Sequence, residues 1–408
     1  MTDGAGLGPV PARSGSNRVL LVLAVGNFIL GISAFVVLGL MTTMSRSLGV
    51  EPATLARILT EYAVAYAIGA PLVIAATGHL PRRLVLTAGM LLTGVGALIC
   101  AVASSMLTVE LARIIGALGA GLYGPAVAGV AVSTAAPERR ATALSTVFMG
   151  FTAAQGIGTP AGTWLGYTFG WQTTFGIVGG LALVMAAMIW RMVPATIPFS
   201  PTSLAELRRV VRTGPILVAL LFTVAFIAAT YTTLTFIAPI LETRLGVGRD
   251  GLSTYMMIYG AMAFVAAVFG GMIADRVGPS RALLFLCAAH AILHPMVTQG
   301  PTSPVAVAIV LGCWSLFGWS HFTMQQSRLV SIAPKDAQLV IALNSSMLYV
   351  GIAAGSWLAA HLVAVPEWRG IAAGSFTLVL TAAIILVIGD RWIARHRAMA
   401  PFASQNPP

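Results

Sequence analysis

The chain has 408 residues, of which 58% are hydrophobic and 9% charged, and its mean hydropathy is +0.90. A soluble globular domain carries about 25% charged residues, so these residues cannot cover the chain with a water-facing shell, and a soluble enzyme or DNA-binding protein is excluded. The net charge of +11 does not indicate a nucleic-acid partner, because the basic residues are spread over loops and form no single patch.

The first 18 residues are rich in Gly, Pro and Ser, and an apolar run of more than 20 residues follows them. That run is too long for the apolar part of a signal peptide and has no A-x-A cleavage site after it, so we expect an uncleaved first helix. The three cysteines lie in separate apolar runs, which predicts neither a disulfide framework nor a metal site.

Twelve apolar segments follow one another along the chain, each near the roughly 20 residues that a membrane-spanning helix needs. They cover approximately residues 19–44, 55–77, 84–104, 107–133, 143–167, 173–193, 216–240, 253–274, 282–298, 305–330, 339–365 and 370–389. We therefore predict an all-α polytopic membrane protein of two pseudo-symmetric six-helix bundles. The expected parts are a tail (1–18), a first bundle (19–193), a linker (194–215), a second bundle (216–389) and a second tail (390–408).

The distribution of basic residues predicts the orientation of the chain in the membrane. If the N-terminus lies in the cytoplasm, 17 of the 23 basic residues fall in cytoplasmic segments and five on the opposite side, while Arg113 lies inside a helix. This imbalance follows the positive-inside rule. Both tails and the linker are therefore expected to be cytoplasmic.

The two halves repeat short patterns. Leu48-Gly49-Val50 recurs as Leu245-Gly246-Val247, and Gly158-x-x-x-Gly162-Thr-Trp-Leu recurs as Gly351-x-x-x-Gly355-Ser-Trp-Leu. Helix packing through small residues explains the glycines alone, but not the residues that follow them in both halves. Repeated halves are typical of transporters in which one bundle rocks against the other around a central site.

Two loops carry related motifs at the expected cytoplasmic side. The loop after the eighth segment reads Gly271-Met-Ile-Ala-Asp275-Arg276-Val-Gly-Pro-Ser-Arg281, and the loop after the second reads Gly78-His-Leu-Pro-Arg82-Arg83. A carboxylate here can pair with arginine or with a helix N-terminus. Anchoring at lipid headgroups is the alternative for these charges.

Two further motifs lie within segments. The fourth contains Leu-Ala-Arg113-Ile-Ile-Gly-Ala-Leu-Gly, and the fifth contains Gly158-Thr-Pro160-Ala-Gly162, followed by Gly-Trp-x-x-x-Phe. Together the four motifs make the sequence resemble the major facilitator superfamily over roughly residues 19–390. It looks most like the twelve-helix drug:proton antiporter group, in the branch of bacterial sugar, purine-nucleoside and chloramphenicol efflux proteins.

The resemblance implies a secondary transporter of the inner membrane that exports a small organic molecule, drug-, sugar- or nucleoside-like, in exchange for protons. It implies that Asp275, Arg276, Arg281, Arg82 and Arg83 form a conformational latch, which Gly78 makes one-sided because the family has Asp there. Gly158, Pro160 and Gly162 correspond to the antiporter motif of the fifth helix. We expect a monomer with no cofactor, no metal and no nucleic-acid partner, in contact with the lipid bilayer.

Two features leave alternatives to proton-driven export open. Ala34 stands where this branch commonly has an acidic residue, which favours an importer or uniporter of the same fold, whereas the motif at Gly158 argues for export. A non-transporting sensor and an intramembrane enzyme are alternatives of another class, although only isolated acids occur within the segments. The sequence contains no G-x-x-x-x-G-K-[ST] motif, so ATP does not drive this chain through a site of its own.

Three residues are candidates for proton coupling. Glu61 and Arg113 lie at similar depths, roughly 9–10 Å from the outer ends of their segments, so we hypothesise that Glu61 carries the proton and Arg113 tunes its pKa. A fixed structural ion pair, or a pair between Arg113 and Glu110, is the alternative. His321 is the third candidate because histidine titrates near neutral pH.

Other polar residues in apolar segments have weaker signals. His290 and His294 have the i,i+4 spacing of metal ligands, but without a third ligand nearby they predict polar contacts within the bundle. Unpaired polar groups are costly in hydrocarbon, so each should contact either substrate or a neighbouring helix. The candidates for the substrate cavity are Asn27, Gln155, Tyr231 and Asn344. Tyr62 and Tyr66, with Tyr255 and Tyr259, form paired stripes that predict either gating or ordinary packing.

Overall fold

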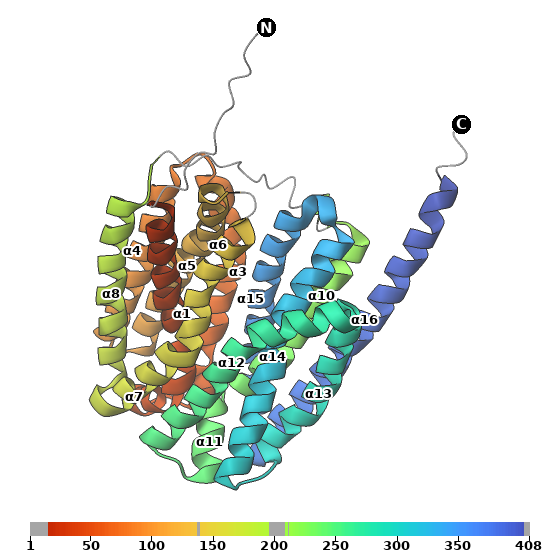
Figure 1. Cartoon of the computed structure of the whole chain (residues 1–408). Coiled ribbons are helices and arrows are strands. Elements are labelled where there is room, and N and C mark those ends of the chain that lie inside the picture. Colours follow the sequence, from red (N-terminus) through yellow and green to blue (C-terminus); the bar gives the residue numbers. More distant parts are fainter. Residues whose placement is uncertain (1–14, 137–138, 196–208, 211, 404–408) are drawn as a thin grey trace.

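The structure is a computed structural model that describes residues 15–136, 139–195, 209–210 and 212–403. These residues form helices and no β-strand, and the order of the helices follows the twelve predicted segments. Figure 1 shows the helices in two groups that lie side by side. The N-terminal half contains α1 (Gly15–Leu48), α2 (Pro52–Leu55) with α3 (Arg57–Thr77), α4 (Arg82–Ala101), α5 (Met106–Thr134), α6 (Arg140–Ala153) with the π-helix η2 (Ala154–Gly158) and α7 (Thr159–Phe169), and α8 (Trp171–Met192).

The C-terminal half repeats this arrangement. It contains α10 (Gly214–Leu234) with α11 (Ile237–Leu245), α12 (Arg249–Val277), α13 (Pro279–Gln299), α14 (Pro304–Ile332), α15 (Ala337–Leu362) and α16 (Arg369–Ala403), with short 3-10 turns η3 (Pro334–Asp336) and η4 (Pro366–Trp368). The predicted twelve-helix fold is confirmed. Most of the predicted linker, residues 196–208 and 211, and residues 1–14 of the predicted first tail lie outside the described residues.

Not all twelve crossings are continuous apolar helices. Among the described residues, nine helices are long and apolar enough to cross a membrane, and α12 is a tenth if its 41° bend lies within one span. Of the other two crossings, α3 is one continuous helix with Pro71 inside it, and the other is divided because η2 separates α6 from α7. Helix breaks are tolerated in a membrane where neighbouring protein satisfies the freed backbone groups.

The sequence repeats mark equivalent turns at one end of the molecule. Gly49 and Gly246, the glycines of the repeated Leu-Gly-Val, both have φ +64°, a left-handed conformation that glycine adopts without steric cost. They follow the first crossing of each half. The hydroxyl oxygens of Ser105 and Ser303 accept hydrogen bonds from backbone amides at the starts of α5 and α14. We call this end the outer end, and the end at which α1 begins the inner end.

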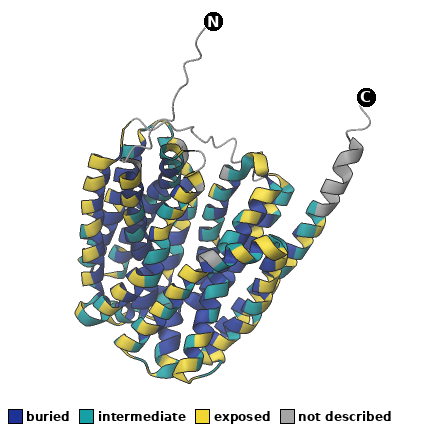
Figure 2. Cartoon of the chain, viewed as in Figure 1, coloured by how far each residue is buried: buried dark blue, intermediate teal, exposed yellow. Residues whose placement is uncertain are grey.

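The two halves meet along a shared core. Each half packs mainly on itself, while α15 contacts α3, and α12 contacts η2 and α7. One continuous group of buried apolar side chains includes residues of both halves. Buried residues lie on the helix faces that point into the molecule, and exposed residues lie on the faces at its periphery (Figure 2). A lipid-facing periphery accounts for the many exposed leucine, isoleucine and valine side chains.

Candidate functional site

The charged group at the centre of the site is Arg113 of α5. It lies seven residues from the outer end of this helix, or about 10 Å along it, and its side chain is 2% exposed. Its Nη1 and Nη2 donate to the backbone carbonyls of Ser33 and Ala34 in α1, the latter at 3.2 Å. Its guanidinium lies 4.2 Å from the ring centroid of Tyr62. No carboxylate of the described residues pairs with it.

Next to Arg113 lies a group of five buried tyrosines from four helices and both halves, which we call the tyrosine cluster. They are Tyr62 and Tyr66 of α3, Tyr231 of α10, Tyr259 of α12 and Tyr349 of α15. Tyr349 was not predicted as a site residue. A single tyrosine in an apolar segment gives no signal beyond the cost of burying its hydroxyl group.

Several polar atoms in this region have no hydrogen-bond partner among the described residues. They are the hydroxyl oxygen of Tyr231, Nε2 of Gln155 and Nε of Arg113. An unsatisfied buried polar atom costs about 1–3 kcal/mol, so groups in this state need a ligand, water or another conformation of the protein. Tyr231 and Gln155 were both predicted to face the cavity.

The other two predicted cavity residues bridge helices. Asn27 Nδ2 donates to the carbonyl of Val147 at 3.0 Å, which joins α1 to α6. Asn344 Oδ1 accepts a 2.6 Å bond from Thr223, and Thr223 also accepts from Gln325 at 3.1 Å. Asn27 therefore shows the helix-to-helix bonding that was the alternative to substrate contact. Asn344 does so through its oxygen, while its Nδ2 remains without a partner among the described residues.

The motif residues of the fifth crossing contact α1. A Cβ on Gly158 would lie 2.3 Å from Ile32, and one on Gly162 would lie 2.6 Å from Val36, so both glycines permit close approach of these helices. Pro160 is the second residue of α7, which follows η2 directly. Gly156 in η2 faces the other half instead: a Cβ on Gly260 of α12 would lie 2.0 Å from the Gln155 carbonyl oxygen.

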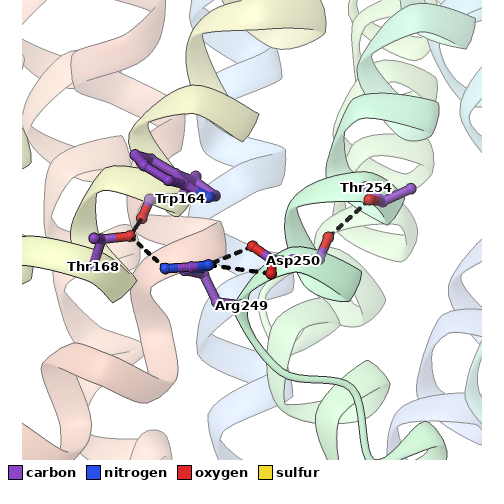
Figure 3. Close-up of polar contacts among 5 residues, drawn as sticks. All are labelled: Trp164, Thr168, Arg249, Asp250 and Thr254. Carbon is purple, nitrogen blue, oxygen red and sulfur yellow. Dashed lines mark hydrogen bonds and ion pairs between the residues drawn. The ribbon is translucent and has the colours of Figure 1, made fainter.

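At the outer end, polar contacts join the two halves, and we call this group the outer gate. Arg249 of α12 donates to Thr168 Oγ1 of α7 at 3.3 Å, and its guanidinium lies 5.2 Å from the Trp164 ring centroid. Its Nε also donates to Asp250 Oδ1 at 2.8 Å. Figure 3 shows how these side chains lie. The hydroxyl of Tyr167 donates to Glu242 Oε1 of α11. Sequence inspection missed these residues, because each interacts with a residue of the other half.

The predicted latch residues lie at the inner end. Asp275, Arg276 and Arg281 are exposed, and Asp275 makes no ion pair with any described residue. Arg82 is 2% exposed and donates to the Gly78 carbonyl at 3.5 Å. Arg83 lies over the Trp190 ring at 4.4 Å. In this conformation the outer gate is closed while the predicted latch carboxylate is unengaged.

Glu61 is not close to Arg113. Its Oε1 pairs with Arg57 at 3.5 Å, and Arg57 also reaches Glu110 at 3.3 Å, so two carboxylates at the outer end share one guanidinium. The hypothesised Glu61–Arg113 pair is therefore wrong for this conformation, and so is the alternative pair of Arg113 with Glu110. Arg57 precedes Glu61 by four residues, a spacing that favours ion pairs on a helix and could have indicated this contact.

The histidine candidates lie inside the C-terminal half. His321 is 1% exposed, and its Nδ1 lies 2.6 Å from the Gly318 carbonyl oxygen. His290 and His294 contact each other. Among the described residues, no group of three or more His, Cys, Asp or Glu side chains could hold a metal ion.

Two repeated helical bundles, a buried polar centre between them and a closed gate at one end define a membrane transport protein. A model of the Major Facilitator Superfamily matches residues 23–338. The chain belongs to this family of transporters, which are not enzymes.

Relatives support this assignment. The chain is 25% identical over 369 residues to the uncharacterized MFS-type transporter YbcL of Bacillus subtilis, covering 90% of this chain and 93% of that protein. It is 28% identical over 343 residues to the inner membrane transport protein YdhP of Escherichia coli, covering 83% and 87%. It is 27% identical over 347 residues to a chloramphenicol resistance protein of Streptomyces lividans, covering 84% and 88%.

Solved structures share the fold. A bacterial homologue of the human lysosomal transporter Spinster, in an inward-facing and unoccupied conformation, matches with a TM-score of 0.73 at 16% identity, covering 93% of this chain and 96% of that one. A D-xylose–proton symporter matches with a TM-score of 0.72 at 16% identity, covering 91% and 97%.

Proposed function

We propose that the protein is a secondary transporter of the inner membrane that exports a small organic molecule in exchange for protons. The observation that carries the proposal is the tyrosine cluster next to Arg113, because it places polar groups from both halves at one site between them. Alternating access needs such a shared site. The relative named as a chloramphenicol resistance protein and the motif at Gly158 support export over import.

The charge of the site supports a substrate class. A buried cation without a carboxylate partner is costly, since backbone carbonyls and one aromatic face compensate only part of its lost hydration. Arg113 is in this position, and no acidic side chain among the described residues accompanies it. We therefore propose that the site takes a neutral or anionic molecule with an aromatic or similarly flat apolar part, which the tyrosine rings would contact.

The orientation and the latch complete the proposal. Both termini lie in the cytoplasm, so the outer gate faces away from the cytoplasm and the structure corresponds to a state closed to the outside. Asp275, Arg276 and Arg281, with Arg82 and Arg83, engage when the inner end closes. The protein works as a monomer.

Flux in proteoliposomes with an imposed pH gradient tests this function. The tracers are chloramphenicol first, then a panel of neutral and anionic antibiotics, sugars and nucleosides. Accumulation against the tracer's gradient that requires the pH gradient supports exchange or symport, and the direction of the gradient that drives it separates the two. Flux independent of pH would indicate a uniporter, and no flux with any tracer would favour a sensor.

A further inference from the structure

Three buried histidines form a polar group inside the C-terminal half, away from the tyrosine cluster. His290 and His294 of α13 are 0% exposed and His321 of α14 is 1% exposed. Thr233 Oγ1 of α10 lies 2.9 Å from His294 Nδ1, and His294 Nε2 lies 3.2 Å from His290 Nδ1. These contacts make a hydrogen-bonded chain that crosses from α10 into α13.

The chain of contacts has two complete hydrogen-bonding arrangements. If His294 Nε2–H donates to His290, then His294 Nδ1 accepts from Thr233 and His290 carries its proton on Nε2. If His290 Nδ1–H donates instead, His294 Nδ1–H donates to Thr233 and His290 Nε2 is a bare lone pair. A proton that binds His290 Nε2 in the second arrangement produces the first, provided that Thr233 gives up its own hydroxyl proton as it accepts one from His294; both rings stay neutral and exchange tautomers. The geometry is that of a proton relay.

His321 lies beyond the open end of this relay. Its Nδ1 must donate to the Gly318 carbonyl, which can only accept, so its Nε2 is the basic nitrogen. His290 Nε2 and His321 Nε2 both lack a partner among the described residues. The Phe226 ring centroid lies 5.0 Å from that of His290 and 4.9 Å from that of His321, so its face is placed to stabilise a positive charge on either ring.

Other titratable groups near the relay are few. Cys287 lies one turn from His290 on α13, and Tyr259 of α12 is separated from the relay by Trp314. Arg244 of α11 is the nearest cation toward the outer end; it donates to the Val297 carbonyl at 2.8 Å, one turn beyond His294. Arg328 of α14, paired with Asp390 at 2.7 Å, lies toward the inner end.

No carboxylate of the described residues pairs with these histidines. The described carboxylates lie toward the outer end, as Glu61, Glu110 and Glu242 do, or toward the inner end, as Asp275 and Asp390 do. A histidine ring has two nitrogens, one of which can accept a proton while the other donates one. Trp314 connects the relay to the tyrosine cluster, since its ring lies 5.5 Å from His294 and 5.6 Å from Tyr259.

We propose that the chain Thr233–His294–His290, together with His321, is the proton-binding site of the transport cycle. This inference rests on the proposed proton exchange. The proton enters and leaves through the relay, and its charge acts on the tyrosine cluster through Trp314. A small pocket lies at the outer end of the C-terminal half and includes Val297, one turn beyond His294. Its lining comes from α11, α13 and α14: Leu241, Arg244, Met296, Val297, Val307, Val310 and Leu311.

The test measures how pH shifts the conformational equilibrium, so it needs no known substrate. The reporter is Ala56→Cys, because Ala56 is 0% exposed here and packs among residues of the C-terminal half at the outer end. The full chain, with Cys313→Ser and in nanodiscs, is labelled with a maleimide from pH 5.5 to 8. Rates are divided by those of the exposed Thr254→Cys, which removes the pH dependence of the thiol itself.

In the protein with an intact relay, we expect the normalised labelling rate to change about fivefold or more between pH 5.5 and 8. A change of this size corresponds to a modest allosteric coupling. His290→Asn keeps a hydrogen-bonding group at the Nδ1 position but cannot titrate, and it should flatten the profile to less than about twofold. His361→Asn, on the surface at the outer end of α15, is the matched control and should retain the wild-type profile.

Thr233→Val and Thr233→Ser form a second pair that keeps both histidines and avoids a disrupted core. The valine variant removes the terminal hydroxyl and should shift or flatten the profile, while the serine variant should not. A profile unchanged in His290→Asn and Thr233→Val overturns the relay while leaving proton exchange intact. A wild-type profile without pH dependence overturns the proton coupling in the proposed function, and the relay with it.

Discussion

The rings of Tyr66 and Tyr349 are stacked across the interface between the two halves. Their centroids lie 3.6 Å apart with 21° between the planes, and the two residues come from α3 and α15. Both side chains are buried next to Tyr62 and Arg113. The central site is therefore closed by a contact that must change whenever the halves move relative to each other.

The internal repeat makes this contact asymmetric. Tyr66 corresponds to Tyr259 and Tyr349 corresponds to Gly156, each at an offset of 193 residues, the same offset that relates Gly158 to Gly351. Where the α3–α15 interface is filled by two rings, the equivalent interface of η2 and α12 has glycine, and the backbones approach each other closely. Tyr259 there accepts a 3.0 Å bond from Trp319. One interface is thus filled by aromatic rings, and the other is a tight backbone crossing.

Removal of the Tyr349 ring should favour the state that is open at the outer end. An aromatic pair contributes about 0.5–1.5 kcal/mol beyond its buried area, so Tyr349→Ala should raise the labelling rate of Ala56→Cys about 2- to 10-fold. Tyr349→Phe retains the stacked ring and should stay within about twofold of wild type. Equal labelling in the alanine and phenylalanine variants would show that the stacking does not hold this state.

Gly260 should tolerate no side chain. A Cβ there would meet backbone atoms of Gln155 and Gly156 at 2.0–2.5 Å, so the helices must separate. Overpacking costs typically 1–3 kcal/mol, and Gly260→Val should lower the thermal unfolding temperature and abolish transport. The control is Gly180→Ala in α8, where an added Cβ meets nothing within 4 Å. If Gly260→Val transports normally, this crossing does not need its close approach.

The outer gate should weaken without Arg249. Arg249→Ala removes the bond to Thr168 and the contact with the Trp164 ring. A cation–π contact at an exposed site contributes about 0.5–1 kcal/mol, which predicts a 2- to 5-fold faster labelling of Ala56→Cys. Arg369→Ala removes an exposed pair with Glu367, at 2.6 Å and within the same half, and should change nothing. A similar rise in both variants would indicate a general effect of surface charge.

Arg113→Lys tests whether the guanidinium itself serves the site. Lysine keeps the charge but cannot donate to two carbonyls while lying flat on Tyr62. We expect a KM at least about tenfold higher for an anionic or neutral tracer, because the substitution weakens substrate binding. The kcat should change less, because the later movement of the two halves does not depend on this contact. A drop in thermal stability with an unchanged KM would instead assign Arg113 a purely structural role.

The twelve crossings and the repeat could be predicted because each membrane helix must be about 20 apolar residues long. Arg113 was predicted for a related reason, since a charge in an apolar segment must face protein. The position of Tyr349 and the outer gate could not be found in this way. Which face of α15 contacts α3, and which residue of α7 meets Arg249, depends on how two whole bundles dock.

Glu61 shows the opposite case. Its spacing from Arg57 in the sequence indicated its actual partner, whereas its depth along the helix did not. Equal depth along two helices suggested a pair with Arg113, but α3 places Glu61 toward the outer end, where Arg57 is four residues away on the same helix. Depth fixes one coordinate of a side chain and leaves its direction around the helix open. A spacing of four residues on one helix fixes both the depth and the direction of one side chain relative to the other.

Glu61→Gln should therefore leave proton-driven transport nearly intact. Glu61 is partly exposed and shares Arg57 with Glu110, so its charge is engaged at the outer end and is not paired with Arg113. We expect pH-driven accumulation in proteoliposomes within about twofold of wild type, since a surface pair contributes at most about 1 kcal/mol. Arg57→Gln, which frees both carboxylates, is the matched control for the local charge. Downhill flux that continues while pH-driven accumulation disappears in Glu61→Gln, but not in Arg57→Gln, would return the coupling role to Glu61 and remove it from the histidines.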